Sequence, residues 1–122
     1  MVMSPEEIVQ AYLDAIESRN FSLARRFLAN HGFSYRSPVF DFDNPDAFIA
    51  SISGVGPILE RIERRRTFVA GNEVCNILTF VTNWSTPRTT NVVQWVTVES
   101  DKIVAMETFF DGRAYREMFI VD

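Results

Sequence analysis

The sequence contains very little cysteine or histidine. Its 122 residues include one cysteine, Cys75, and one histidine, His31. A single cysteine cannot form an internal disulfide, which is typical of a reduced cytoplasmic protein. A single histidine excludes a multi-histidine metal site. We therefore expect neither a metal nor any other cofactor.

Long apolar runs and an excess of positive charge are also missing. No apolar run approaches the length of a membrane span, and the N-terminal MVMSPEE is acidic where a signal peptide would be basic and then apolar. The net charge of −4 argues against binding to nucleic acid or to anionic membranes. The length suits one hydrophobic core. We expect a soluble, cytoplasmic, unprocessed chain with a single domain over residues 1–122.

Phenylalanine, in contrast, is abundant. The chain has 11 phenylalanines, within a composition of 47% hydrophobic and 23% charged residues that is ordinary for a globular protein. So many aromatic side chains predict either a heavily aromatic core or an aromatic-lined cavity.

Helix signals are concentrated in the first half. Ser4 followed by Pro5, Glu6 and Glu7 predicts a helix start with a capping box. A second short helix is expected in FSLARRFLAN at 21–30, with Ser22 as its cap. The stretch NPD at 44–46 repeats the cap-proline-acid signature, so a third helix, PDAFIASIS, should end at Gly54.

Strand signals dominate the second half. Four segments combine β-branched and aromatic residues: 58–70, 73–84, 89–99 and 102–111. Turn residues separate them, at Gly71-Asn72, in the STPR stretch at 85–88 and at Ser100-Asp101. Such short links predict antiparallel neighbours. A fifth strand, from Phe33 to Phe42, should be interrupted at Pro38. Helices first and strands later indicate an α+β domain whose helices cover one face of the sheet.

Several stretches carry a family resemblance: AYLDAIESRNFSLARRFLA, RSP, TNVVQWVTVESDKIV and METFFDGRAYREMF. In order and spacing they resemble the nuclear-transport-factor-two-like superfamily, in its SnoaL-like or ketosteroid-isomerase-like branch. The resemblance implies a cystatin-like curved antiparallel sheet, wrapped into a cone around a hydrophobic cavity, with N-terminal helices packed over it. The superfamily contains both enzymes and non-catalytic binding or dimerising proteins, so the fold leaves the activity open.

The resemblance also assigns site positions. Ketosteroid isomerases use an aspartate base with a tyrosine and a protonated aspartate as oxyanion donors. The tyrosine falls on Tyr12, the base on Ser37 and the second aspartate on Gln94. The late-strand aspartate of the epoxide-hydrolase branch falls on Thr108. Serine, glutamine and threonine thus replace the family's key carboxylates, and whether the chain is an enzyme stays open.

Strand alternation places Gln94 on one face with Val92 and Val96, and Met106 on one face with Thr108 and Phe110. The resemblance turns Gln94, Met106 and Thr108 toward the cone interior. The expected ligand-binding residues are Tyr12, Ser37, Phe40, Gln94, Met106, Thr108 and Phe110. The expected catalytic candidates are Tyr12, Asp111 and Asp41.

The stretch YRSPVFDFDNP at 35–45 holds two aspartates that alternate with phenylalanines. If Phe40 and Phe42 face the cavity, Asp41 and Asp43 face solvent. Acids just before a helix start also favour the positive end of the helix. The pattern therefore favours a surface or capping role over a catalytic pair.

The basic run RIERRR at 61–66 is not a nucleic-acid signal here. Alternation puts Arg64 and Arg66 on one face, and Arg61, Glu63 and Arg65 on the other. One face is expected at a sheet edge or in a subunit contact. The resemblance implies a homodimer through the outer sheet face, for which Ile77, Val81 and Trp95 are suitable apolar residues.

Three functions are open at this stage. The first is a domain that binds a small hydrophobic molecule in its cavity. The second is an isomerase, lyase or polyketide-cyclase-type enzyme for an enolisable carbonyl substrate, with Tyr12 and Gln94 as donors and Asp111 or Asp41 as base. The third is a non-catalytic dimerisation module whose cavity is filled by phenylalanines.

Overall fold

The computed structural model describes residues 3–113, which form helices and one sheet. The helices are α1 (Pro5–Glu17), α2 (Phe21–Arg26), α3 (Pro45–Ser53) and the short 3-10 helix η1 (Gly56–Ile58). The strands are β1 (Ser34–Arg36), β2 (Asp41–Phe42), β3 (Leu59–Ala70), β4 (Glu73–Trp84), β5 (Thr86–Glu99) and β6 (Lys102–Phe109).

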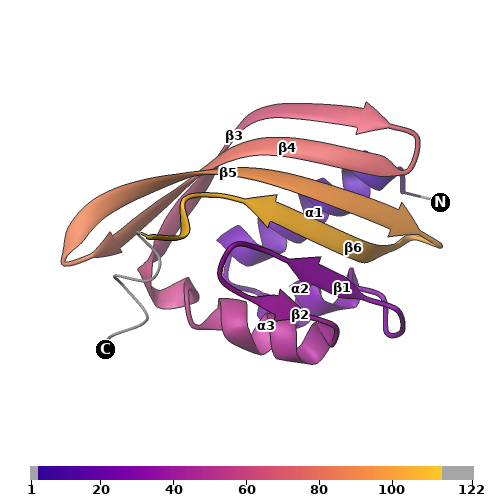
Figure 1. Ribbon diagram of the computed structural model, residues 1–122, viewed down its shortest axis with the longest axis horizontal. Coiled ribbons are helices and arrows are strands. Elements are labelled where there is room, and N and C mark those ends of the chain that lie inside the picture. Colours follow the sequence, from indigo (N-terminus) through magenta and orange to yellow (C-terminus); the bar gives the residue numbers. More distant parts are fainter. Residues whose placement is uncertain (1–2, 114–122) are drawn as a thin grey trace.

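The six strands form one curved sheet in the order β2-β1-β6-β5-β4-β3. Strands β3 to β6 are antiparallel neighbours, as expected, while β1 runs parallel to β6. The sheet curves without closing, and the helices lie against one of its faces (Figure 1). The chain therefore has the predicted α+β architecture, with helices covering one side of a curved sheet.

Side-chain caps start the helices. The Ser4 hydroxyl accepts from the Glu7 N–H at 3.1 Å, and the Glu7 carboxylate accepts from the Ser4 N–H at 2.8 Å, which is the predicted capping box. Asn44 caps α3 through a 2.9 Å bond from the Ala47 N–H. For α2 the prediction was wrong: Asn20, two residues before Ser22, accepts from the Leu23 N–H and begins the helix earlier.

The segment predicted as one interrupted strand is a hairpin. Arg36 pairs with Asp41, so the chain reverses between β1 and β2 instead of continuing past Pro38. The Ser37 hydroxyl holds this turn: it accepts from the N–H groups of Val39 and Phe40 and donates to the Phe40 carbonyl at 2.8 Å. A side chain that satisfies three backbone groups makes the tight reversal stable.

Strand β4 has its predicted bounds, whereas β5 begins at Thr86, three residues before its predicted start. Only Ser85, with a left-handed φ of 63°, separates them, and the expected STPR turn is otherwise part of β5. Pro87 lies opposite Asn83 within the sheet. It is tolerated because this end of β5 has β4 as a neighbour but lies beyond its pairing with β6, which ends at Val93.

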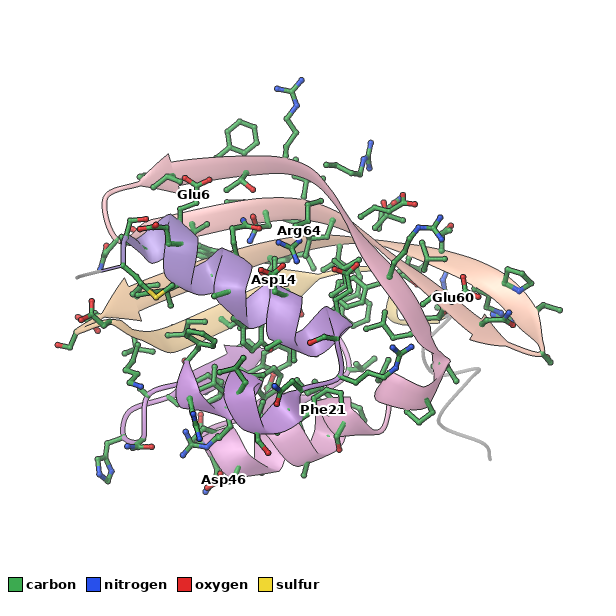
Figure 2. All side chains as sticks on the ribbon, turned by 180° about the vertical axis from the view of Figure 1, so that it is seen from behind. Glu6, Asp14, Phe21, Asp46, Glu60 and Arg64 are labelled. Carbon is green, nitrogen blue, oxygen red and sulfur yellow. The ribbon has the colours of Figure 1, made fainter. Side chains whose placement is uncertain are left out.

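A bulge in β3 changes which arginines share a face. The register shifts between Arg64 and Arg66, so Arg66 lies opposite Ile77 and Thr67 lies opposite Asn76. The extra residue turns Arg66 outward and Thr67 inward, and the prediction that Arg64 and Arg66 share a face was wrong. Arg64 instead faces α1, where its guanidinium pairs with Asp14 at 2.6 Å (Figure 2).

The hydrophobic core lies between the inner sheet face and the helices. Its members are almost completely buried and come from α1, α2, α3, β3 to β6 and the segment between α2 and β1. They include Val9, Leu13, Ala24, Phe48, Val74, Leu78, Val96 and Ile103. This packing fixes α1 across the sheet and leaves space between α3, the β1–β2 hairpin and the sheet.

Candidate functional site

Two adjacent cavities lie between the helices and the inner face of the sheet. The outer cavity has a volume of about 160 Å³ and includes the half-exposed Phe40 in its lining. The inner cavity has a volume of about 110 Å³ and includes the buried residues Tyr12 and Met106. The two cavities share a wall formed by Tyr35, Phe48, Ile52, Val55, Phe80 and Thr108.

Aromatic side chains form much of the outer cavity. The phenylalanines in its lining are Phe40, Phe42, Phe48, Phe80 and Phe110. Phe42 and Phe48 have ring centroids 6.0 Å apart, and Tyr35 stacks on Phe48 at 4.4 Å. These rings come from the β1–β2 hairpin, α3, β4 and the end of β6, so tertiary packing brings together residues that are far apart in the sequence.

A tyrosine and a threonine form the polar part of the shared wall. The Tyr35 hydroxyl lies 2.8 Å from the Thr108 hydroxyl. Burial raises the pKa of Tyr35 and outweighs the hydrogen bonds with Thr108 and Ser37, which lower it. Tyr35 is therefore protonated at neutral pH and can donate a hydrogen bond.

Tyr12 is the most buried polar residue that the sequence placed at the site. It is 3% exposed and lines the inner cavity. Within residues 3–113 its hydroxyl has no hydrogen-bond partner. Burial, and to a lesser extent the nearby Tyr35, raise its pKa, so the hydroxyl stays neutral. An unpaired hydroxyl in a buried cavity is available to a polar atom of a ligand.

Gln94 lines the same inner cavity and is 4% exposed. Its Oε1 atom accepts from Asn76 Nδ2 at 3.1 Å, and its Nε2 atom contacts Met106 Sδ at 3.5 Å. Thioether sulfur is a weak acceptor. The amide nitrogen of Gln94 can therefore still donate to a stronger acceptor in the cavity.

The structure brings most of the expected ligand-binding residues together. Tyr12, Gln94, Met106 and Thr108 line the inner cavity. Ser37, Phe40, Thr108 and Phe110 line the outer cavity. The Ser37 hydroxyl is engaged by the backbone of its own turn, so its contribution there is mainly to hold the hairpin.

The two carboxylates that were catalytic candidates do not belong to either lining among the described residues. Asp41 is exposed on the opposite face of β2 from Phe42. Asp111 is exposed and pairs with Arg113 at 2.8 Å, and these contacts lower its pKa to about 2. Asp43 is also exposed and pairs with Arg36 at 2.8 Å, as the surface interpretation of this stretch predicted.

Tyrosine is the only ionisable residue type among the described lining residues of the two cavities. In residues 3–113, no three His, Cys, Asp or Glu side chains lie close enough together to hold a metal ion. No helix in this part of the chain is both long and apolar enough to cross a membrane.

Sequence reasoning missed Tyr35, Phe48 and Asn76. Tyr35 lies two residues before Ser37, so strand alternation places it on the same face as that expected site residue. Asn76 lies between the buried Val74 and Leu78 on the inner face of β4, where a polar residue is itself informative. Phe48 carried no such signal, because only the packing of α3 against the hairpin brings it to the cavities.

Comparisons with known proteins identify the fold. No family model and no curated protein matches the sequence. A solved NTF2-like protein of unknown function from Cytophaga hutchinsonii has a TM-score of 0.83 at 18% identity, covering 94% of this chain and 96% of that one.

Two further solved structures carry names linked to the predicted branch. A hypothetical protein with a ketosteroid-isomerase-like fold from Catenulispora acidiphila, in complex with trimethylamine, has a TM-score of 0.76 at 14% identity, covering 89% of this chain and 88% of that one. A protein assigned as a SnoaL-like polyketide cyclase from Shewanella denitrificans has a TM-score of 0.75 at 8% identity, covering 93% and 94%. The chain thus has the NTF2-like fold that the resemblance predicted. At these identities the likeness establishes the fold alone.

Proposed function

We propose that the chain binds a small hydrophobic molecule that carries one polar end. The observation that carries this proposal is the junction of the two cavities. The outer cavity offers aromatic surface, and the inner cavity adds the Tyr12 hydroxyl and the Gln94 amide. Apolar lining with a few placed polar groups is typical of small-molecule sites.

The lining supports binding more directly than acid–base chemistry. Its tyrosines donate hydrogen bonds but are neutral at physiological pH. Binding needs only apolar contact and hydrogen bonds, which these residues supply. Proton abstraction also needs a base, and the described lining residues provide none that titrates near neutral pH.

Native mass spectrometry of protein purified from its source cells tests this function first. We expect a retained small molecule, released by denaturation. Thr90, in the outer cavity lining, gives the test variant Thr90→Trp, which should fill the cavity and abolish retention. Thr89→Trp is the matched control, because the adjacent residue is exposed on the other face of β5. Equal retention by the two variants would place the molecule elsewhere, and a lack of any cavity ligand would contradict the proposal.

A second candidate function is catalysis on an enolisable carbonyl compound. The observation that favours it is that Tyr12 and Gln94 line one cavity, where both could donate to an enolate oxygen. Exchange of the α-protons of acetophenone in heavy water, followed by NMR, tests this function. We expect Asp41→Asn or Asp111→Asn to abolish exchange if either carboxylate is the base. Exchange that persists in both variants would exclude these two residues from that role.

The outer sheet face supports assembly into a homodimer. Its adjacent cross-strand rows are Phe68, Cys75, Trp95 and Glu107, and Arg66, Ile77, Val93 and Phe109. Phe68, Val93, Trp95 and Phe109 are exposed large hydrophobic residues. Arg66 and Glu107 lie at diagonally opposite corners of these two rows. A two-fold axis can therefore bring Arg66 of one copy near Glu107 of the second copy, and Glu107 of the first near Arg66 of the second. We therefore favour a second copy of this chain as the partner of this face.

A further inference from the structure

A row of polar side chains crosses the inner face of the sheet. The strand register places Thr67, Asn76, Gln94 and Thr108 side by side on β3, β4, β5 and β6. Asn76 is 0% exposed and Gln94 is 4% exposed. Burying amides costs free energy unless they are hydrogen-bonded, so the arrangement of their bonds is informative.

The first bonds of this row have a fixed direction. Arg64 Nη1 donates to Gln10 Oε1 at 3.0 Å. Because a guanidinium only donates, Gln10 must turn its oxygen toward Arg64 and its nitrogen toward the interior. Gln10 Nε2 then donates to Asn76 Oδ1 at 3.3 Å, and the Thr67 hydroxyl donates to the same oxygen at 2.7 Å.

The orientation of the Asn76 amide determines the orientation of the Gln94 amide. Since the Asn76 oxygen accepts from Gln10 and Thr67, its nitrogen is left to donate, and it donates to Gln94 Oε1 at 3.1 Å. The Gln94 nitrogen is therefore the amide atom that remains for the inner cavity, where Met106 Sδ is its weak acceptor. An amide that could point either way is held in one orientation.

Two carboxylates of α1 secure the start of the chain of bonds. Arg64 Nη2 lies 2.6 Å from Asp14 Oδ1 and 3.6 Å from Glu17 Oε1. Figure 2 shows Arg64 and Asp14 close together between α1 and the sheet. The Arg64 side chain is 26% exposed. Its ion pairs therefore lie at the edge of the core, and its bond to Gln10 points into the core.

We propose that Arg64, Gln10 and Asn76 form a relay that fixes Gln94 as a hydrogen-bond donor toward the inner cavity, so that the bound molecule must present an acceptor oxygen there. A ketone, aldehyde or ester carbonyl meets this requirement, and a group that only donates does not. Arg64 and Asn76 are positioning residues, because they act on the ligand through Gln94. The inference rests on the proposed binding function and adds the chemical class of the ligand's polar end.

Two probes of nearly the same shape test the relay. Acetophenone carries a carbonyl where α-methylstyrene carries a methylene group, so the ratio of their affinities measures the acceptor preference. We expect wild-type protein to favour acetophenone by roughly tenfold, the value of one buried hydrogen bond. Addition of acetophenone should also shift the side-chain amide NMR signal of Gln94.

Two variants alter the direction of the relay. In Asn76→Asp, at mildly alkaline pH, the carboxylate accepts only, so Gln94 should turn its nitrogen to it and its oxygen to the cavity. Arg64→Met removes the donor that sets the direction and changes a partly exposed side chain, so it tests the relay if the first variant does not fold. Both should bring the affinity ratio close to one or below it. Arg65→Met, at the exposed bulge residue without a cross-strand partner, is the control and should keep the wild-type ratio.

The outcomes separate the two proposals. A loss of stability would weaken the binding of both probes alike and leave the ratio of their affinities unchanged. A changed affinity ratio therefore reports the direction of the Gln94 amide. Equal affinity of the wild type for both probes, or a preference that survives in Arg64→Met and in folded Asn76→Asp, would overturn the relay while binding stands. If neither probe binds the wild type, the binding function and the relay both fall.

Discussion

The Tyr12 hydroxyl is buried beside a cavity, and its pKa is raised by burial. In the unfolded chain a tyrosine ionises near its ordinary pKa of about 10. Because the folded pKa is higher, the stabilisation is fully present below that pH and is lost as pH rises above it. We expect Tyr12→Phe to reduce this alkaline loss by up to about 1.4 kcal/mol per pH unit, measured by urea unfolding at several alkaline pH values.

The same variant separates the binding role of Tyr12 from its packing role. At neutral pH we expect Tyr12→Phe to change the free energy of unfolding by less than about 1 kcal/mol, because the hydroxyl lacks a protein partner. Acetophenone affinity should nevertheless fall several-fold. A large destabilisation at neutral pH would show that the hydroxyl has a structural role.

Asp111 differs from the buried tyrosines because it is exposed. Its contacts with Arg113 lower its pKa from 3.8 to about 2, so it stays ionised at all but strongly acidic pH. Its contribution to stability is present above the ordinary pKa and is lost as pH falls through about 2. We expect carbon-detected NMR titration to find this low pKa, and Arg113→Gln to return it toward the ordinary value. An unperturbed pKa in the wild type would contradict the ion pair.

At the scale of elements, the β1–β2 hairpin and α3 carry the rim of the outer cavity. Asn44 caps α3 and follows directly from the hairpin that presents Phe40 and Phe42. We expect Asn44→Ala to lower the free energy of unfolding by about 1 kcal/mol, the usual effect of losing a cap. Urea unfolding measures this change. Asn44→Asp should keep most of the stability, because its carboxylate can accept the same N–H bond; equal losses in both variants would argue against capping.

The hairpin turn depends on one hydroxyl. Ser37 bonds to the backbone of Val39 and Phe40, so its removal loosens the segment that carries Phe40. The position that the resemblance assigned to a catalytic base is thus used for architecture in this chain. A serine can satisfy a turn backbone, whereas it lacks the basicity that proton abstraction requires.

At the scale of the whole molecule, the exposed apolar rows of the outer sheet face predict association. Trp95 is 46% exposed near the middle of these rows. We expect wild-type protein to sediment as a dimer and Trp95→Glu to raise the dissociation constant by about a hundredfold, because a central aromatic residue is replaced by a charge. Thr89→Glu, an exposed position on the same strand, is the control. A wild-type monomer at high concentration would contradict the dimer.

The charged corners offer a second test of the same assembly. Arg66→Glu should weaken the dimer, and adding Glu107→Arg should restore part of it if the two residues meet across the two-fold axis. Glu107 also lies near Arg36 of its own chain, so restoration is expected to be partial. Analytical ultracentrifugation of the single and double variants distinguishes these results.

Local sequence determined the parts of this protein that depend on neighbouring residues. Ser4 and Asn44 cap helices because a cap needs only its own hydrogen-bonding atom and the N–H groups of the next turn. Alternation placed Gln94 on one face with Val92 and Val96, and Thr108 on one face with Met106, because strand side chains change face at every residue; the resemblance turned these faces inward, where both residues are buried.

Tertiary structure decided what depends on register and on distant contacts. The bulge after Arg64 turned Thr67 inward and Arg66 outward, whereas alternation alone placed Arg66 on the same face as Arg64. The cavities exist because α3 and the hairpin pack opposite the sheet, and the proposed direction of the Gln94 amide follows from Arg64 through three bonds that join four elements, β3, α1, β4 and β5. A one-residue shift reverses the face of every later side chain, so these features appear only when the strands are paired.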